Sequence, residues 1–271
     1  MAAQPMSTMS LEGCRLAYRR MGSGRPLFVL NGLTATNADW DPVFLERLAS
    51  ANELVLLDNR GIGASADDGA PFDIPKLARD TAHVIEALEL RPASVLGWSM
   101  GGFIGQALAV EHADHVEKLV LLSTDPGGAA AVVADRAVRD QITDTSGTPH
   151  EQARRLLAVV FPADLAESIY RDFGDVVAQA RAKLSPDLVD RQIAAVEAWH
   201  RDGLADRLGG LKAPALVLTG MEDVVIPASN ALSLVSAIPG AWLAQFPGGG
   251  HAFMAQYPQA AANVINEFLA L

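Results

Sequence analysis

The sequence predicts an α/β fold: a mostly parallel central sheet with helices on both faces and an inserted helical lid. Short, continuously apolar segments alternate with helix-like segments up to residue 122. Residues 127–208 then contain helix-like segments and no convincing strand, and the alternation resumes afterwards. Strands that alternate with helices favour right-handed crossovers and a parallel sheet. We therefore expect a core from residues 11–126 and 209–271, with residues 127–208 inserted as the lid.

The individual elements follow from local patterns. Residues 54–57 are continuously apolar, as in a parallel strand that is covered on both faces. Leu77, Val84 and Leu88 share one face at helical spacing, which predicts a helix over residues 74–88. The predicted strands are residues 15–20, 27–30, 54–57, 94–96, 116–122, 215–219 and 242–246. The predicted helices are residues 41–48, 74–88, 102–111, 227–237 and 258–271 in the core, and residues 130–142, 151–160, 165–173 and 186–201 in the lid.

Composition and charge narrow the class of protein. The chain has 271 residues, half of them hydrophobic, and its formal net charge is -11. This length suits one large α/β domain with an insertion. The acidity argues against nucleic acid and anionic membranes as partners, because both need clustered Lys and Arg. The single cysteine excludes an intramolecular disulfide. With no signal-peptide pattern and no apolar run of about 20 residues, we expect a soluble cytoplasmic protein.

Gly61 and Gly63 follow a predicted strand, a position where glycines can bind a dinucleotide. The third glycine of the G-x-G-x-x-G pattern is missing, however, and Asp67, Asp68 and Gly69 follow in place of a helix. The histidines show no paired spacing typical of metal ligands. We therefore predict a structural turn here, and we expect neither a cofactor nor a metal.

The pentapeptide Gly97-Trp98-Ser99-Met100-Gly101 lies between a predicted strand and a predicted helix. In that setting Gly-x-Ser-x-Gly is typical of a nucleophile elbow, a tight and strained turn that holds a serine hydroxyl clear of the sheet. The flanking glycines let neighbouring segments approach closely. We therefore predict that Ser99 is a nucleophile.

A serine hydroxyl needs a base within hydrogen-bond reach. His251 follows the last predicted strand after three glycines, which allow the loop to fold back toward the serine. The base needs an acid that accepts its other N–H and fixes its tautomer. We assign this role to Asp223 in preference to its neighbour Glu222. Asp125, which also follows a predicted strand, is the alternative acid.

Attack on a carbonyl creates an oxyanion that needs preformed N–H donors. The backbone N–H of Met100, at the start of the helix after Ser99, is one candidate donor, and that of Leu33 is the other. Side chains from the core and the lid are expected to line the substrate pocket: Asn31, Trp98, Phe161, Trp199, Val225 and Phe253.

The chain resembles the α/β-hydrolase superfamily from about residue 11 to residue 271. The resemblance rests on the motifs Asn31-Gly32, Asp58-x-Arg60-Gly61-x-Gly63-x-Ser65, Gly97-Trp98-Ser99-Met100-Gly101-Gly102, Gly220-x-x-Asp223-x-Val225-x-Pro227 and Gly250-His251. It is most similar to the small esterase, enol-lactonase and cofactor-free haloperoxidase group. The resemblance implies that Ser99, Asp223 and His251 are nucleophile, acid and base, in the chain order typical of this fold.

One position departs from the pattern of this superfamily. Many members have His-Gly where this chain has Asn31-Gly32. Asparagine can still form hydrogen bonds and shape the loop, so the oxyanion assignment is kept. Enol-lactonase-like members also carry Asn near here, which points weakly toward lactones. Serine at position 99 argues against the branches that use aspartate as nucleophile.

From these features we expect a serine hydrolase that cleaves small to medium carboxylic esters or lactones through an acyl-serine intermediate. A perhydrolase side activity would follow if peroxide replaced water as the acyl acceptor. Two alternatives stay open. The same residues would serve hydrolysis of a carbon–carbon bond in a β-diketone-like substrate, or acyl transfer. In another class, a ligand-binding or receptor protein would keep the fold without turnover, because fold does not fix function.

Overall fold

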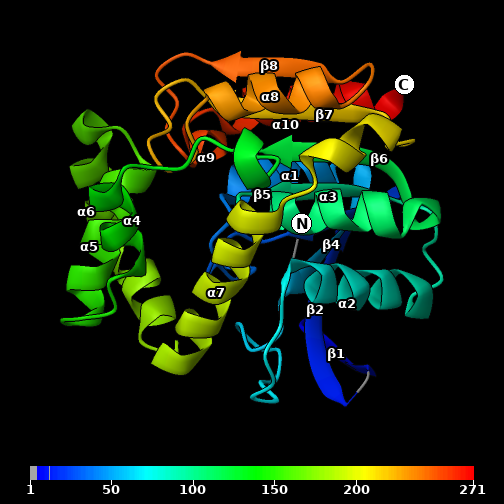
Figure 1. The fold of residues 1–271 in the computed structure, drawn as a ribbon. Coiled ribbons are helices and arrows are strands. Elements are labelled where there is room, and N and C mark those ends of the chain that lie inside the picture. Colours follow the sequence, from blue (N-terminus) through cyan, green and yellow to red (C-terminus); the bar gives the residue numbers. More distant parts are fainter. Residues whose placement is uncertain (1–4, 12) are drawn as a thin grey trace.

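The computed structural model describes residues 5–11 and 13–271. Within these residues, eight strands form one sheet in the order β1–β2–β4–β3–β5–β6–β7–β8 (Figure 1). The strands are β1 (Ser7–Leu11), β2 (Cys14–Gly22), β3 (Arg25–Leu30), β4 (Asn52–Asp58), β5 (Ala93–Trp98), β6 (Val116–Leu122), β7 (Ala215–Gly220) and β8 (Trp242–Phe246). β1 and β2 are antiparallel to their neighbours, whereas β3 to β8 are parallel. The predicted fold class is therefore confirmed.

The parallel strands bring their carboxyl ends to one edge of the sheet. Leu30, at the end of β3, lies opposite Leu57 of β4 and Gly97 of β5. Trp98, the last residue of β5, lies opposite Leu122, the last residue of β6. The loops that leave these strands consequently meet at the same edge, where open α/β sheets bind ligands.

Helices cover both faces of the sheet (Figure 1). They are α1 (Pro42–Ala49) and α10 (Pro258–Ala270) on one face, and α2 (Ile74–Ala87), α3 (Met100–Glu111) and α8 (Ser229–Ala237) on the other; a short helix, α9 (Phe253–Gln256), precedes α10. Each face has its own hydrophobic cluster. Phe44 of α1 and Phe268 of α10 belong to one cluster, and Phe103 of α3 belongs to the other. The sheet is thus buried on both sides, which explains its continuously apolar strands.

Residues 127–208 form the helical segment, which lies largely beyond the carboxyl ends of the parallel strands (Figure 1). Its α-helices are α4 (Arg136–Thr143), α5 (Pro149–Val160), α6 (Ala163–Arg181) and α7 (Pro186–Asp202). Helices α5 and α6 pack against each other, and α7 leads back toward the core. The segment contains no strand, as the sequence predicts.

Local sequence determines where these helices begin. The Thr148 hydroxyl accepts a hydrogen bond from the backbone N–H of Glu151, whose carboxylate accepts one from the backbone N–H of Thr148. This capping box starts α5, with Pro149 at a first-turn position that tolerates proline. Ser185 caps α7 in a similar way, ahead of Pro186.

Some element boundaries differ from those expected. β1 was not predicted because it pairs only with β2 and is largely exposed, so it has no apolar run. The helix expected over residues 130–142 begins only at Arg136. The side-chain amide of Asn230 bonds both the N–H and the C=O of Val132, which keeps this residue out of a helix. Helix α6 continues to Arg181, well beyond the predicted end at residue 173.

In the part of the chain that the structure describes, no helix is long and apolar enough to cross a bilayer.

Strands β3 and β5 and helix α3 meet with almost no space between their backbones. A Cβ atom on Gly101 would overlap the carbonyl oxygen of Leu30. A Cβ atom on Gly97 would overlap the carbonyl oxygen of Gly101. Glycine is required at both positions because no side chain fits between the segments.

We expect Gly101→Ala to lower the free energy of unfolding by about 3 kcal/mol, because the backbone of Leu30 cannot move without disturbing the sheet. Gly210→Ala is the matched control, since a Cβ atom there would meet nothing within 4 Å. Urea denaturation of both variants measures the difference. Equal stability of the two would contradict the close approach at Gly101.

Candidate active site

Ser99 lies on the sharp turn between β5 and α3. Its φ is 56° and its ψ is -122°, a left-handed conformation that a residue with a side chain rarely adopts. The turn is held from two sides. The backbone N–H of Ser99 donates to the Leu122 carbonyl at 2.9 Å, and the Thr124 hydroxyl donates to the Ser99 carbonyl at 2.9 Å. The strained turn predicted from the pentapeptide is therefore present.

His251 and Asp223 meet in the loops that follow β8 and β7. His251 Nδ1 lies 2.9 Å from Asp223 Oδ2, and both residues are buried. The other oxygen, Asp223 Oδ1, accepts the backbone N–H groups of Val225 and Ile226 at 2.9 and 2.8 Å. The carboxylate is thus held in one orientation, and its hydrogen bond with Nδ1 leaves Nε2 as the other ring nitrogen, available for proton transfer.

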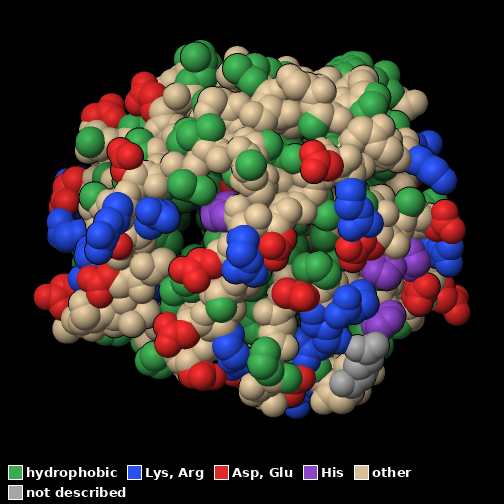
Figure 2. Space-filling model, in the orientation of Figure 1, with side chains coloured by type: hydrophobic (Ala, Val, Ile, Leu, Met, Phe, Trp, Pro, Cys, Tyr) green, Lys and Arg blue, Asp and Glu red, His purple; other side chains and the backbone are tan. Residues whose placement is uncertain are grey.

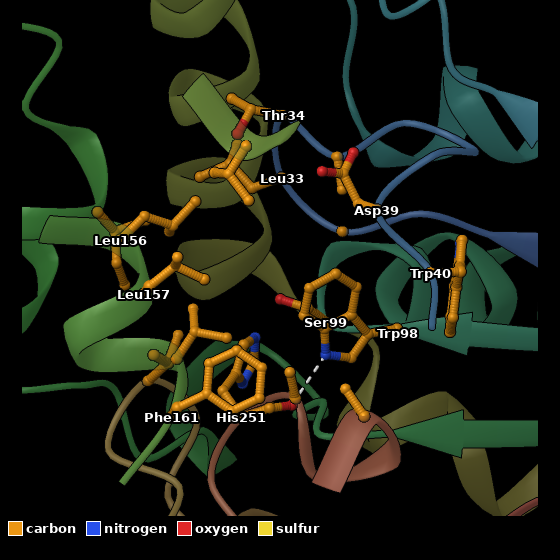
Figure 3. A pocket seen from close by; sticks show the side chains of 18 of the residues that line it. Leu33, Thr34, Asp39, Trp40, Trp98, Ser99, Leu156, Leu157, Phe161 and His251 are labelled. Atoms are coloured by element: carbon orange, nitrogen blue, oxygen red, sulfur yellow. Dashed lines mark hydrogen bonds between the residues drawn. The ribbon is translucent and has the colours of Figure 1, made fainter. Parts of the chain in front are cut away.

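Two further contacts fix the loop that carries His251. Trp98 immediately precedes Ser99, and its Nε1 donates a hydrogen bond to the His251 carbonyl at 3.0 Å. A dashed line marks this bond in Figure 3. The Gln256 amide accepts the N–H of Gly250 at 2.8 Å and donates to the Gly248 carbonyl at 3.0 Å. The loop after β8 is therefore tied both to the Ser99 turn and to α9.

Asp125, the alternative acid, lies in the loop after β6 and contacts other residues than His251. Its Oδ1 accepts the indole N–H of Trp199 at 3.1 Å and the backbone N–H of Gly127 at 2.8 Å. Its Oδ2 lies 3.1 Å from His200 Nε2 of α7. Asp125 thus joins the core to the helical segment, whereas the carboxylate beside His251 is that of Asp223.

Leu33 and Met100, the two residues expected to supply oxyanion donors, line a cavity together with Ser99. Met100 is the first residue of α3, whose initial N–H groups have no partner within the helix. The loop of Leu33 is held at Thr34, which has a φ of 59°. The Thr34 N–H donates to Gln192 Oε1 of α7 at 2.8 Å. The helical segment thereby supports the loop that carries Leu33.

Two cavities meet at Ser99. The smaller has a volume of about 140 Å³ and includes His251 in its wall. Figure 3 shows it, with the Ser99 hydroxyl facing a space bordered by Leu33, Leu157 and His251. The larger has a volume of about 440 Å³. It lies between α4 and α7, where Figure 2 shows the surface hollowed, with acidic and basic side chains on the margin.

The six side chains expected in the pocket divide into two groups. Trp98 and Phe161 line the smaller cavity, and Val225 lines both. The other three line neither cavity, because protein groups surround them. Asn31 is fully buried and bonds Trp40 Nε1 and the Leu57 carbonyl; Trp199 donates to Asp125 and stacks on Phe103; Phe253 stacks on Phe246.

Several lining residues were not singled out from the sequence. In the smaller cavity these include Trp40, Leu156, Leu157, Met254 and Arg181. Trp40 is a lone aromatic in a loop, and Arg181 is one of many charged residues in the helical segment. No local pattern distinguishes them, because their positions depend on how the helical segment packs onto the core.

Within the described residues, no group of three or more His, Cys, Asp or Glu side chains is arranged to hold a metal ion. The polar groups that gather at Ser99 are instead a hydroxyl, an imidazole paired with a carboxylate, and backbone N–H groups. Such a set can attack a carbonyl, transfer its proton and stabilise the resulting oxyanion.

The chain matches the family model described as "alpha/beta hydrolase fold" over residues 25–256. A hydrolase from Pseudomonas aeruginosa PA01 is similar, with 30% identity, a TM-score of 0.83 and 98% of both chains covered. The enol-lactonase from Burkholderia xenovorans LB400 has the same fold, with 24% identity, a TM-score of 0.81, and 98% of this chain and 100% of that chain covered. A Caulobacter sp. (strain K31) protein, provisionally named the carbamate hydrolase RutD, is 30% identical over 254 residues, covering 91% of each.

The match to the family model extends over most of the chain and includes the segments of Ser99, Asp223 and His251. The relatives support a hydrolase activity. The chain belongs to the alpha/beta hydrolase fold family.

Proposed function

We propose that this protein is a serine hydrolase that cleaves small to medium carboxylic esters or lactones through an acyl-enzyme intermediate. Ser99 is the nucleophile, His251 the general base and acid, and Asp223 the residue that orients His251. Fold alone would not carry this proposal. It depends on one observation: the strained Ser99 turn opens into the same cavity as His251, whose Nδ1 is bonded to the buried Asp223 carboxylate at 2.9 Å.

The first half of the reaction forms the acyl-enzyme. Ser99 Oγ attacks the carbonyl carbon and passes its proton to His251 Nε2, while Asp223 stabilises the imidazolium. The carbonyl oxygen becomes an oxyanion that accepts hydrogen bonds from the N–H groups of Leu33 and Met100. When the tetrahedral intermediate collapses, His251 Nε2 returns the proton to the departing alkoxide.

The second half regenerates the free serine. A water molecule attacks the acyl carbon, and His251 Nε2 takes its proton. The same two N–H groups stabilise the second oxyanion, and Ser99 leaves as the protonated hydroxyl. With a lactone the alkoxide stays attached to the acyl group, so one hydroxy acid is released.

The two cavities support a substrate of limited size with two arms. Leu33, Ile142 and Val225 line both cavities beside Ser99, so the scissile bond would lie where the cavities meet. The walls are mostly apolar, and their volumes of about 140 and 440 Å³ suit one short and one larger group. We further propose that the helical segment, residues 127–208, acts as a lid that excludes water from this space.

Ser99→Ala should lower kcat/KM for 4-nitrophenyl butyrate by a factor of about 10⁴ or more, because no acyl-enzyme can form. Acetate and octanoate esters measured in parallel report the size of the acyl site. Wild-type protein should show burst or steady release of nitrophenolate. Hydrolysis by Ser99→Ala at the wild-type rate would contradict the proposal. Ligand binding without turnover by the wild type would indicate a binding protein.

Carbamates are a second substrate class to compare, because a relative is provisionally named as a carbamate hydrolase. The carbonyl group of a carbamate presents the same electrophile to Ser99, but its nitrogen makes it less reactive. Ethyl butyrate and ethyl N-ethylcarbamate are a matched pair. We expect a higher kcat/KM for the ester. A higher kcat/KM for the carbamate would show that carbamates, and not esters, are the preferred substrate class.

Asp223→Asn should lower kcat by a factor of about 10⁴, because an amide cannot fix the required tautomer of His251. Asp125→Asn is the matched comparison. It should lower the free energy of unfolding by about 2 kcal/mol through its contacts with Trp199, Gly127 and His200, and reduce kcat far less. If the large loss of kcat followed Asp125→Asn instead, the orienting acid would be Asp125.

A further inference from the structure

Arg181 is a buried cation in the wall of the smaller cavity. It is the last residue of α6, is only 6% exposed, and lines the cavity that contains Ser99 and His251. We propose that Arg181 is the anion-recognition residue of this cavity, which binds a free carboxylate carried by the ester or lactone. This proposal rests on the proposed function, and it narrows the substrate class to carboxylates that also contain a cleavable acyl bond.

The partners of Arg181 carry no charge. Nη1 donates to the Thr34 hydroxyl at 3.0 Å, and Nε donates to Gln152 Oε1 at 3.3 Å. Among the described residues, no Asp or Glu carboxylate lies within ion-pairing distance of the guanidinium. Two of its five N–H groups are therefore used by neutral acceptors, and its charge has no direct counter-ion.

Two nearby charged groups act on Arg181 in opposite directions. Burial lowers the pKa of Arg181, the positive charge of Arg155 lowers it further, and only Asp39 opposes them. Asp39 also lines the cavity, but its Oδ2 accepts the N–H and the hydroxyl of Thr36 at 2.6 and 2.7 Å. One oxygen of the Asp39 carboxylate is therefore engaged by its own loop, and among the described residues the carboxylate forms no ion pair with Arg181.

Arg60 shows how the same chain treats a buried arginine with a structural role. Its Nε and Nη2 donate to the two oxygens of Asp80 at 3.0 and 2.9 Å, and Asp68 is a further partner. Burial alone would lower the pKa of Arg60, but the hydrogen bond and charge of Asp80 outweigh it and raise the pKa. Arg60 thus has carboxylates in direct contact, whereas Arg181 has only the charge of Asp39 nearby and no ion pair.

An uncompensated buried charge costs free energy, and a guanidinium stays charged in proteins. A ligand carboxylate would offset this cost through charge-assisted hydrogen bonds. The neighbours of Arg181 give the site its orientation: Gln152 lies outside the smaller cavity, whereas Thr34 lies in its wall, next to Leu33. Arg181 and Gln152 also line a separate pocket on the other side. A carboxylate in the smaller cavity would use N–H groups of Arg181 that have no protein acceptor.

The cavity between Ser99 and Arg181 limits the rest of the substrate. Leu156, Leu157 and Phe161 provide apolar walls, and the volume is about 140 Å³. A short aliphatic chain that ends in a carboxylate matches this combination of apolar walls and one cation. Monoesters of short dicarboxylic acids are the simplest compounds of this kind.

The test compares pairs of substrates in which one member ends in a carboxylate and the other in a methyl group. Monomethyl glutarate and monomethyl adipate are compared with methyl pentanoate and methyl hexanoate by acid release in a pH-stat. Acetate esters of 3-hydroxypropanoate and of 1-propanol test the carboxylate on the alcohol side. We expect a higher kcat/KM for the charged member in one of these two series.

Arg181→Gln should remove the preference for charge. We expect kcat/KM for the favoured charged ester to fall about 10- to 100-fold, and that for its neutral partner to change less than about threefold. Arg181→Lys should recover part of the preference. A melting curve of each variant verifies folding. An equal loss on charged and neutral esters, or a wild-type preference for the neutral ones, would overturn the assignment.

Thr34→Val separates recognition from support of the loop, because it removes the hydroxyl bonded to Arg181 but leaves the cation. It should lower kcat/KM for the charged esters less than Arg181→Gln does, because the cation that binds the carboxylate stays in place. Calorimetric titration of Ser99→Ala with monomethyl glutarate and methyl pentanoate tests the site without turnover. If the wild type cleaves no ester but monomethyl glutarate binds Ser99→Ala more tightly than methyl pentanoate does, the proposed function fails and the anion site stands. If the wild type cleaves charged and neutral esters equally well, the proposed function stands and the anion site fails.

Discussion

The contact between the backbones of Leu30, Gly97 and Gly101 is the constraint on which the rest of the site depends. It lets α3 begin directly beneath the end of β5, so Ser99 must take a left-handed conformation to connect them. Because Leu30 ends β3, the same contact places the Leu33 loop beside the Ser99 turn. The strain at Ser99 is supported by the sheet on both sides, which is how such conformations persist in folded proteins.

The remaining polar groups reach this point through the order of the strands. β5, β6, β7 and β8 lie side by side, so the loops after β7 and β8 bring Asp223 and His251 to the edge that carries Ser99. The hydrogen bond from Trp98 to the His251 carbonyl connects the end of β5 to the loop after β8. A serine, an imidazole and a carboxylate that lie far apart in the sequence thereby come to the same edge of the sheet.

The sequence was informative where one local pattern implied one backbone geometry. The Gly-x-Ser-x-Gly turn, the strand ends before Asp223 and His251, and the sheet class are of this kind. It was uninformative about which way a side chain points when packing decides. Asn31, Trp199 and Phe253 were expected in the pocket, but each is engaged by neighbouring protein groups. Edge strand β1 likewise lacks the apolar run by which a buried strand is detected.

Arg181 is another residue whose environment is decided by packing and not by local sequence. Sequence alone cannot tell it from the exposed arginines of the helical segment, because burial and partners are properties of the packed structure. Its environment then argues for function rather than stability, since Arg60 shows that this chain can compensate a buried guanidinium fully with carboxylates. Binding sites commonly retain groups that cost stability when empty. A buried cation without an ion pair, in the same cavity as a candidate nucleophile, is therefore more simply explained by a ligand that supplies the missing carboxylate than by the fold that contains it.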